Sequence, residues 1–209
     1  MTMAHIIHEF GDADQLRWEA ITLPDPQPNE VRIRQIAVGM NMMEIGLRIG
    51  AYPGPPLPFI PGVEAAAVVE AVGSEVKDIA VGDRVGYAGL PIGSYCEARN
   101  FPAERLFPLP DDISDKTAAA SMVKGMTAEF MLRRSYPVGN GSRVLIHAAA
   151  GATGLMCVQL ARHLGAEVFG TVSSDEKAAF VRDFGCEHPI VYTRDKFADQ
   201  ILDATDGAG

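Results

Sequence analysis

The stretch from residue 144 to residue 154, which reads VLIHAAAGATG, decides the fold class of this 209-residue chain. It begins as a short apolar strand (144–148) and passes through a loop of small residues into a segment with helical character, 154–164, which ends at Gly165. A strand, a tight loop of small residues and a helix in direct succession are typical of the first unit of a dinucleotide-binding fold.

The chain around this stretch alternates between strand and helix patterns. Further strands are predicted at 167–172 and 189–193, and further helices at 174–184 and 196–204. A β-α-β-α-β-α order predicts a parallel sheet with helices on its faces. A complete dinucleotide fold has two such halves and six strands. We therefore expect the first half of a doubly wound Rossmann sheet, truncated after three strands.

The loop approximates the Gly-x-Gly-x-x-Gly pattern, with Ala149 at the first glycine position, Gly151 at the second and Gly154 at the third. The second glycine lets the backbone approach a pyrophosphate, and the third lets the helix pack closely on the strand. The helix directs free N–H groups and its positive dipole end at the phosphates. We expect Ala150, Gly151, Ala152 and Gly154 to bind a nicotinamide dinucleotide; the alternative is an ordinary glycine-rich turn.

The end of the second strand indicates which dinucleotide is bound. NAD enzymes place an acid about 20 residues beyond the loop to bind the ribose, but this strand ends in 170–173, GTVS. Ser173 and Lys177 are suited to a 2′-phosphate, which predicts NADPH. Two alternatives stay open: Ser173 and Glu176 form a capping box beside a solvated Lys177, or Asp175 binds the ribose of NAD.

The first part of the chain has a different character. Proline and glycine turns separate short strand patterns at 31–34, 65–72, 82–87, 94–98 and 105–109, which predicts a small, mostly antiparallel β unit. Helical stretches follow at 118–122, with Ser114 as a candidate N-cap, and at 127–134. We place the domain boundary between residues 120 and 121, with domains 1–120 and 121–209.

Composition excludes several classes of protein. The net charge is −9, with 9 Lys and Arg against 17 Asp and Glu in residues 1–120, so no basic stripe for nucleic acid is expected. No apolar run approaches the ~18 residues of a membrane span, and no signal peptide pattern opens the chain. The widely spaced Cys96, Cys157 and Cys186 argue against a disulfide framework. We expect a soluble, cytoplasmic protein.

Motifs along the whole chain resemble the medium-chain dehydrogenase/reductase superfamily, and within it the zeta-crystallin-like quinone oxidoreductases. They are 39–44 (GMNMME), 48–53 (RIGAYP), 61–66 (PGVEAA), 82–85 (GDRV), 124–127 (KGMT) and 147–151 (HAAAG). The resemblance implies a GroES-like catalytic domain beside a Rossmann domain, with the active site in the cleft between them. Zinc-dependent members place a Cys and a His where this chain has Asn41 and Val63, and only Glu64 remains, so we expect no metal site.

The resemblance also implies roles for individual residues. Asn41 and Tyr52 should line the substrate and nicotinamide pocket, and Thr127 should contact the nicotinamide. Lys177 and Tyr192 should flank the adenosine phosphate. We expect a structural role for Glu44, where the family usually has Asp. Three nearby methionines are expected to serve as adaptable core packing, or alternatively to contact substrate: Met40, Met42 and Met43.

The implied activity is hydride transfer from NADPH to a quinone, without zinc. Donors placed at the quinone oxygen would stabilise the developing negative charge, with the Asn41 amide and the Tyr52 hydroxyl as candidates; the alternative role of Tyr52 is to stack on the substrate. One alternative is an alkenal or enoyl reductase on the same scaffold, and another is a non-catalytic, crystallin-like NADPH binder. The full-length protein should be a homodimer, and we expect the 209 residues alone to be unstable or inactive.

Overall fold

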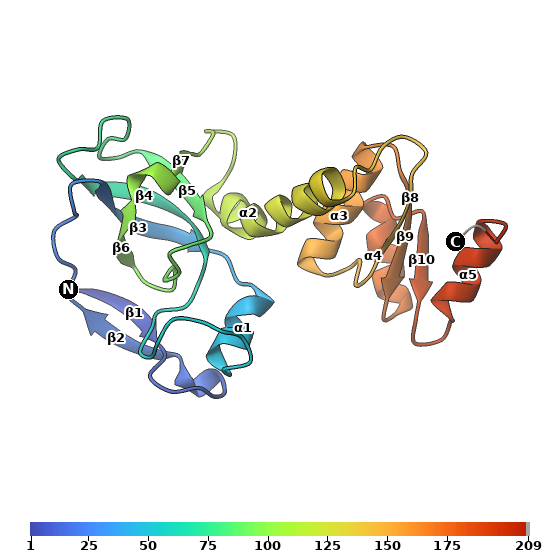
Figure 1. Cartoon of the computed structure of the whole chain (residues 1–209), viewed down its shortest axis with the longest axis horizontal. Helices are drawn as coiled ribbons and strands as arrows, with labels where there is room; N and C mark the ends of the chain where they lie inside the picture. Colours follow the sequence, from blue (N-terminus) through green and yellow to red (C-terminus); the bar gives the residue numbers. More distant parts are fainter. Residues whose placement is uncertain (208–209) are drawn as a thin grey trace. The chain divides into compact units, whose positions relative to one another are not determined.

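The computed structural model describes residues 1–207, so the last two residues of the expected second domain, Ala208 and Gly209, lie outside it (Figure 1). The chain divides into two compact units, Met1–Val123 and Lys124–Gly209. The division therefore falls three residues after the boundary placed from the sequence. Each unit has its own sheet and its own buried core.

The first unit contains an antiparallel hairpin and a five-stranded antiparallel sheet. The hairpin pairs β1 with β2, and the sheet has the order β6-β3-β4-β5-β7. Its elements are β1 (Thr2–Ile6), β2 (Arg17–Ile21), β3 (Glu30–Val38), α1 (Met42–Arg48), β4 (Glu64–Val72), β5 (Arg84–Ala88), β6 (Ala98–Pro102), β7 (Phe107–Pro108) and most of α2 (Asp115–Glu129), with short 3₁₀ turns at Ala13–Gln15 and Ala103–Arg105.

The sheet of the first unit is held by alternating apolar side chains on one face. Members of this core come from β3, β4, β5 and β6: Val31, Ile33, Ala65, Ala67, Val69, Val85, Tyr87 and Phe101. The period of two that predicted a strand at 31–34 is thus the period of burial in β3, whereas the apolar run at 65–72 begins β4 with buried residues on both faces.

Two predictions about the first unit are wrong in detail. Residues 94–98 are mostly a loop, because Gly93 and Tyr95 donate their N–H groups to the carbonyls of Gly62 and Pro61 instead of to a strand. The two predicted helical stretches are one helix, α2, which continues as a π-helical segment, Phe130–Ser135. The Ser114 cap is confirmed, since its Oγ accepts the N–H of Thr117 at 3.1 Å.

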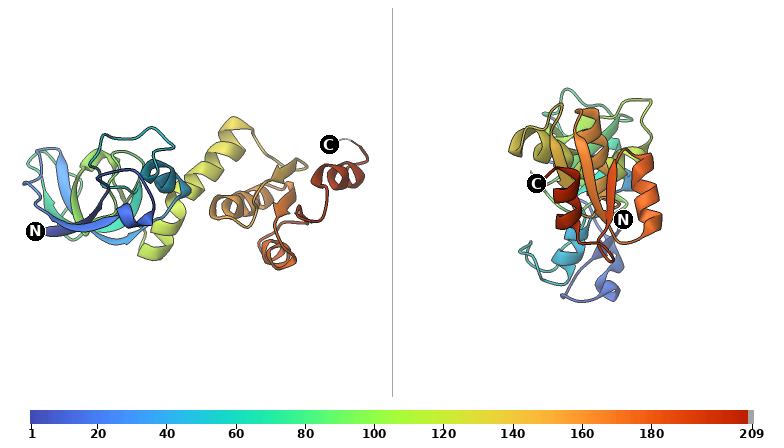
Figure 2. Two further views of the ribbon diagram at one scale, coloured as in Figure 1. Left: turned by 90° about the horizontal axis from the view of Figure 1, so that it is seen from below. Right: turned by 90° about the vertical axis from the view of Figure 1, so that its right-hand side faces the viewer.

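The second unit is a three-layered α/β structure. Its parallel sheet has the order β10-β9-β8 and is formed by β8 (Arg143–Ile146), β9 (Glu167–Val172) and β10 (His188–Val191). Helices α3 (Ala152–His163), α4 (Asp175–Asp183) and α5 (Phe197–Ala204) connect or follow the strands, and α4 and α5 lie on opposite faces (Figure 2). This order is that of strands 3-2-1 in a Rossmann sheet, which confirms the predicted fold class.

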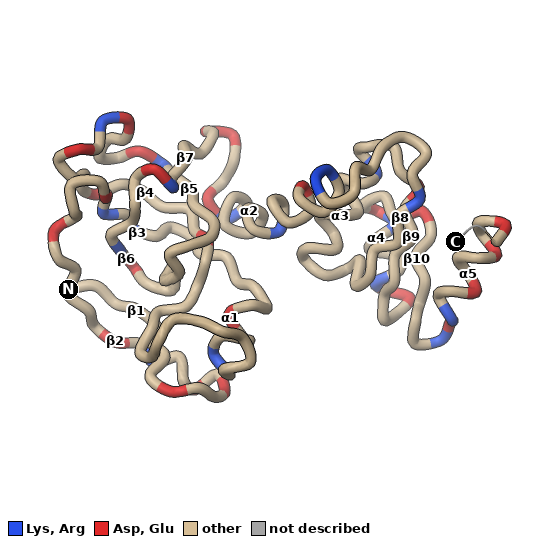
Figure 3. Tube along the Cα trace, viewed as in Figure 1, with Lys and Arg blue, Asp and Glu red and all other residues tan. Residues whose placement is uncertain are grey.

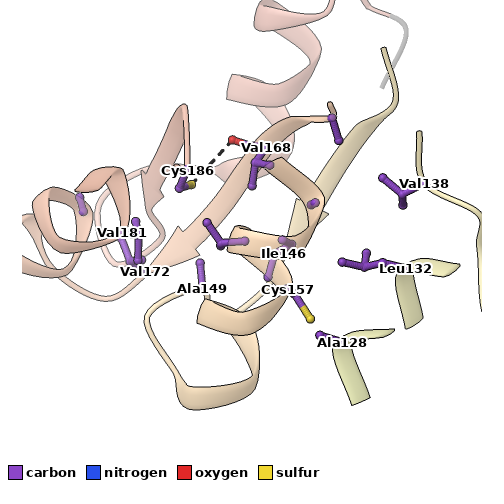
Figure 4. Packing of buried hydrophobic residues seen from close by; sticks show 14 of the residues in the cluster. Ala128, Leu132, Val138, Ile146, Ala149, Cys157, Val168, Val172, Val181 and Cys186 are labelled. Carbon is purple, nitrogen blue, oxygen red and sulfur yellow. Dashed lines mark hydrogen bonds between the residues drawn. The ribbon is translucent and has the colours of Figure 1, made fainter. Parts of the chain in front are cut away.

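The core of the second unit joins the sheet to the helix that precedes it. Ala128 and Leu132 pack in one cluster with Ile146 of β8, Cys157 of α3 and Val168 of β9 (Figure 4). Because this cluster reaches the loop at Ala149 as well, packing holds the loop between β8 and α3 in a fixed position.

Candidate functional site

The loop between β8 and α3 has the close packing that a phosphate loop needs. Gly151 is the N-cap of α3, and its N–H donates to the carbonyl of Ala148 at 2.8 Å. A Cβ on Gly154 would overlap that same carbonyl oxygen and would lie 2.9 Å from the Cα of Ala149. Only glycine fits at residue 154, which is the role of the third glycine in a dinucleotide-binding loop.

The start of α3 presents backbone donors to solvent. The first N–H groups of a helix have no partner within the helix. Ala152, Thr153 and Gly154 supply these groups here, and Leu155 is the first to bond back, to the carbonyl of Gly151 at 2.8 Å. These donors at the positive end of a twelve-residue helix fit a pyrophosphate.

Ala149, which replaces the first glycine of the pattern, is accommodated by a glycine on the next strand. Ala149 is fully buried, and a Cβ on Gly170 of β9 would lie only 2.8 Å from its methyl carbon. Thr171 fixes the same loop, because its carbonyl accepts the Ala149 N–H at 3.0 Å and its Oγ1 accepts the Ala148 N–H at 3.2 Å. Gly170 on β9 therefore leaves room for the methyl group that Ala149 has in place of the first glycine of the pattern.

The carboxyl end of β9 brings together the residues expected at the adenosine phosphate. The Nζ of Lys177 donates to the Oγ of Ser173 at 3.0 Å. Tyr192, just after β10, is bonded through its N–H to the carbonyl of Val172 and leaves its ring exposed. Ser173, Lys177 and the backbone of Tyr192 therefore lie at one strand end.

The capping-box alternative for Ser173 is wrong. Ser174 is the N-cap of α4, and its Oγ accepts the Lys177 N–H at 3.3 Å. Both serines are suitable N-cap residues by type, but only Ser173 has a Glu three residues later, and the backbone geometry nevertheless selects Ser174. The hydroxyl of Ser173 is thus directed at the Lys177 ammonium and not at the helix end.

Sequence reasoning missed Arg194 at this strand end. Its guanidinium contacts the carboxylate of Asp175 at 3.2 Å and that of Asp195 at 3.1 Å. These hydrogen bonds and charges raise the pKa of Arg194. No local pattern links residue 194 to residue 175, since the contact depends on the parallel pairing of β10 with β9.

In the first unit, Asn41 is held by two buried carboxylates. Its amide nitrogen donates to Glu44 at 3.2 Å and to Glu64 at 3.0 Å, and its backbone N–H donates to Glu44 at 2.6 Å. Glu44 is 4% exposed and Glu64 is 0% exposed. Both amide hydrogens are engaged by these two carboxylates, so the expected donation to a substrate oxyanion stays a prediction and requires the substrate to replace one of them.

Three segments of the chain position this arrangement. Asn41 is the N-cap of α1 and forms a capping box with Glu44, a signal that the spacing Asn-x-x-Glu already carried in the sequence. Glu64 begins β4, and its other oxygen accepts the Val123 N–H at 2.8 Å. Gly39 allows the close approach, because a Cβ there would overlap a carboxylate oxygen of Glu64.

Tyr52 lies against the same short helix. A Cβ on Gly46 would overlap its ring, and its N–H donates to the Gly46 carbonyl at 3.2 Å. The side chain is 55% exposed, and its hydroxyl makes no hydrogen bond with any of residues 1–207. Its backbone and ring edge are thus fixed while the hydroxyl is free to donate.

Tyr95 lies close to the two carboxylates. Burial raises the pKa of its phenol to about 12, and the negative charges of Glu44 and Glu64 add to the effect. Tyr95 is therefore a neutral phenol throughout the physiological range.

The expectation of core packing is wrong for all three methionines. Met40 is 77% exposed and Met42 is 78% exposed, and Met43 is also exposed. They flank Asn41 at the start of α1, where the helix faces outward.

Residues 1–207 contain no group of three or more His, Cys, Asp or Glu side chains gathered as metal ligands. Val63 is a buried apolar residue, and Cys96, Cys157 and Cys186 are each buried as free thiols. Within the described part of the chain, none of the helices combines the length and apolar character needed to cross a bilayer.

Comparison with known proteins places the chain in a family. Residues 27–111 match the alcohol dehydrogenase GroES-like domain, and residues 152–209 match a domain described as zinc-binding dehydrogenase. A 2-haloacrylate reductase of a Burkholderia species is 44% identical over all of this chain and 64% of its own length. A quinone oxidoreductase of Pseudomonas aeruginosa is 43% identical over 95% of this chain and 61% of its own length.

A solved structure agrees with these matches. The quinone oxidoreductase of Escherichia coli complexed with NADPH superposes with a TM-score of 0.95 at 37% identity, over 98% of this chain and 63% of that one. The present chain thus spans somewhat less than two thirds of the length of these relatives. Both domain matches and the fold agree, and the chain belongs to the medium-chain dehydrogenase/reductase superfamily, with quinone oxidoreductases among its relatives.

Proposed function

We propose that this protein is an NADPH-dependent quinone oxidoreductase that works without zinc. The observation that carries the proposal is the phosphate loop, in which Gly154 packs against Ala148 and the start of α3 presents free N–H groups. The pair of Ser173 and Lys177 at the end of β9 favours the phosphorylated dinucleotide. Similarity to proteins named quinone oxidoreductase, one of them solved with NADPH, supports the acceptor and the cofactor.

The roles divide between the two parts of the chain, which we propose to be a GroES-like catalytic domain, residues 1–120, and the first half of a Rossmann domain, residues 121–209. NADPH, when bound, supplies the hydride. The pyrophosphate is held by Ala150, Gly151, Ala152 and Gly154, the adenosine phosphate by Ser173, Lys177 and Tyr192, and the nicotinamide is contacted by Thr127.

Tyr52 and Asn41 are the residues that we propose to contact the substrate. The free hydroxyl of Tyr52 donates to the quinone oxygen on which negative charge develops, while its ring offers a flat surface for stacking. Asn41, whose amide is held by two carboxylates, lines the substrate pocket and orients a bound group. A zinc site of the superfamily's type lacks its donors, since an amide and an isopropyl group stand at the Cys and His positions: Asn41 and Val63.

A second candidate is reduction of an activated alkene such as an enone or a 2-haloacrylate. The 44% identity to a 2-haloacrylate reductase over the whole chain favours it. In that reaction the carbon next to the carbonyl must receive a proton after hydride addition, so the Tyr52 hydroxyl would be required as a proton source and not only as a hydrogen-bond donor.

We also propose that the complete protein is a cytoplasmic homodimer with no nucleic-acid partner. Three buried, free cysteines suit a reducing compartment. Lys and Arg are scattered along the chain and not gathered in one element (Figure 3). Light scattering on the purified protein tests the dimer, and retention on single-stranded RNA at physiological salt would contradict the absence of a nucleic-acid partner.

The decisive experiment follows NADPH oxidation by the product of the complete reading frame, with a quinone or an enone as acceptor, NADH in parallel and a chelator present. We expect quinone-dependent, chelator-resistant turnover that prefers NADPH. Turnover with the enone alone would establish the second candidate. Tight NADPH binding without any acceptor-dependent oxidation would indicate a non-catalytic, crystallin-like binder, and absence of NADPH binding would overturn the proposal.

A further inference from the structure

The carboxyl end of β9 holds two cations and a carboxylate that no single stretch of sequence brings together. Lys177 is bonded to Ser173 at 3.0 Å, and Arg194 is bonded to Asp175 at 3.2 Å. We call these four residues the β9-end cluster. All of them lie in the second unit, around the turn from β9 to α4 and the segment that follows β10.

This strand end has an electrostatic problem if it is to bind a phosphate. The 2′-phosphate of NADPH carries about −1.5 to −2 charges at neutral pH, yet the first turn of α4 contains Asp175 and Glu176. The two carboxylates repel the phosphate, which is also negative. The single positive charge of Lys177 does not balance the two negative charges of the carboxylates. A bare carboxylate at the end of the second strand would instead accept hydrogen bonds from the ribose hydroxyls of NADH.

Resting on the proposed function, we propose that Arg194 determines the cofactor preference by neutralising Asp175 and by donating to the 2′-phosphate. The guanidinium has five N–H donors in a planar fork, so it can hold a carboxylate and a phosphate at the same time. Asp195 contacts its Nε and Nη2 and leaves Nη1 to face Asp175.

The ion pair between Arg194 and Asp175 is exposed, which lets Arg194 also contact a phosphate. The side chain of Arg194 is 61% exposed and that of Asp175 is 77% exposed. Exposed ion pairs contribute little to stability because water and salt screen them. A bound phosphate dianion can therefore accept a hydrogen bond from Arg194 at a small cost in free energy. The guanidinium still reduces the negative charge at Asp175.

The test measures dissociation constants for NADPH and for NADH by nicotinamide fluorescence, which requires no substrate. Arg194→Ala should raise the NADPH constant about 10-fold, the loss expected for one exposed charge-assisted hydrogen bond, and leave the NADH constant unchanged or lower. Adding Asp175→Asn to Arg194→Ala should recover part of the NADPH affinity, because the exposed carboxylate is gone.

Arg143→Ala is the matched control. Arg143 also forms an ion pair, with Glu167 at 3.1 Å, but at the amino ends of β8 and β9. The six residues of β9 separate the two ends by roughly 17 Å, more than a Debye length at physiological salt. This variant should change neither constant.

The outcomes separate the two proposals. If Arg194→Ala weakens the binding of NADPH and NADH equally, or weakens the binding of neither, the role of Arg194 is overturned while the proposed function stays intact. If the unmodified protein binds neither cofactor, the proposed function fails and the role of Arg194 fails with it.

Discussion

The two candidate sites are built in opposite ways. The phosphate loop at α3 offers backbone N–H groups, and its shape is set by residues within one strand-loop-helix unit, with support from Thr171. The arrangement around Asn41 offers side-chain atoms, and its shape is set by carboxylates from α1 and β4. A backbone site fails when an added Cβ separates the loop from its helix, whereas a side-chain site fails when one buried partner is removed.

The largest expected effect concerns the backbone site. In Gly154→Ala the added Cβ would overlap the Ala148 carbonyl, so the loop must move away from α3. We expect the free energy of unfolding to fall by about 1–3 kcal/mol, and NADPH affinity to fall about 100-fold, as for a displacement of ~1 Å in a preorganised site. Chemical denaturation and fluorescence titration measure the two effects.

The matched control is Gly139→Ala in the same unit, where an added Cβ meets nothing within 4 Å. It should bind NADPH as the unmodified protein does. Normal NADPH binding by Gly154→Ala would mean that close packing at the loop is not required for NADPH binding.

The side-chain site is tested by Glu64→Ala. Removing this carboxylate leaves the Asn41 amide and the Val123 N–H without the acceptor they use. An unsatisfied buried donor costs about 1–3 kcal/mol, and because both donors are only partly buried we expect the total loss of unfolding free energy to stay in that range. Denaturant titration provides the measurement.

Glu70→Ala on the same strand is the control, because Glu70 forms only an exposed ion pair with Arg34. Its effect should stay below about 1 kcal/mol. Equal effects of the two substitutions would show that the buried carboxylate is not what organises Asn41.

A smaller effect is expected for Tyr52→Phe, which keeps the ring on Gly46 and removes the free hydroxyl. Quinone turnover should fall about 10-fold, the size of one lost hydrogen bond to a charged group, with little change in NADPH affinity. Steady-state rates test this, and Tyr136→Phe, an exposed tyrosine of the second unit, serves as control. Unchanged turnover would leave stacking as the only role of Tyr52.

The smallest effect is a pH dependence at Tyr95. The folded pKa is about 12 against an ordinary 10, so the folded state holds the phenolic proton more tightly. The stability that this proton supports is complete below pH 10 and is lost as the pH rises to 12. We expect a loss of about 1 kcal/mol, after allowing for partial exposure of the ring.

Denaturant titrations at several pH values between 9 and 12 measure this slope. Tyr95→Phe should flatten it, and parallel slopes for both proteins would mean that folding does not raise the pKa of Tyr95.

Much of the second unit was predictable because its signals are local. Strand 167–172 was predicted with the bounds that β9 has, and the loop was found from seven consecutive residues. At the adjacent Ser173 and Ser174 the sequence left a capping box at Ser173 open as an alternative, and only the backbone geometry identified Ser174 as the cap. The β1-β2 hairpin was missed altogether, since its pairing is antiparallel between two short strands with weak alternation.

The sequence by itself determined the β-α-β order, the glycine-dependent loop and the absence of an acid at residues 170–173, because each follows from residues close in the chain. Only the tertiary structure decided that Asn41 uses its amide hydrogens on Glu44 and Glu64, and that Arg194 lies on Asp175. Those contacts join residues up to 23 positions apart in sequence. Residue spacing predicts a contact only when both residues lie in the same helix or strand. Here sheet pairing and close packing bring the partners together instead.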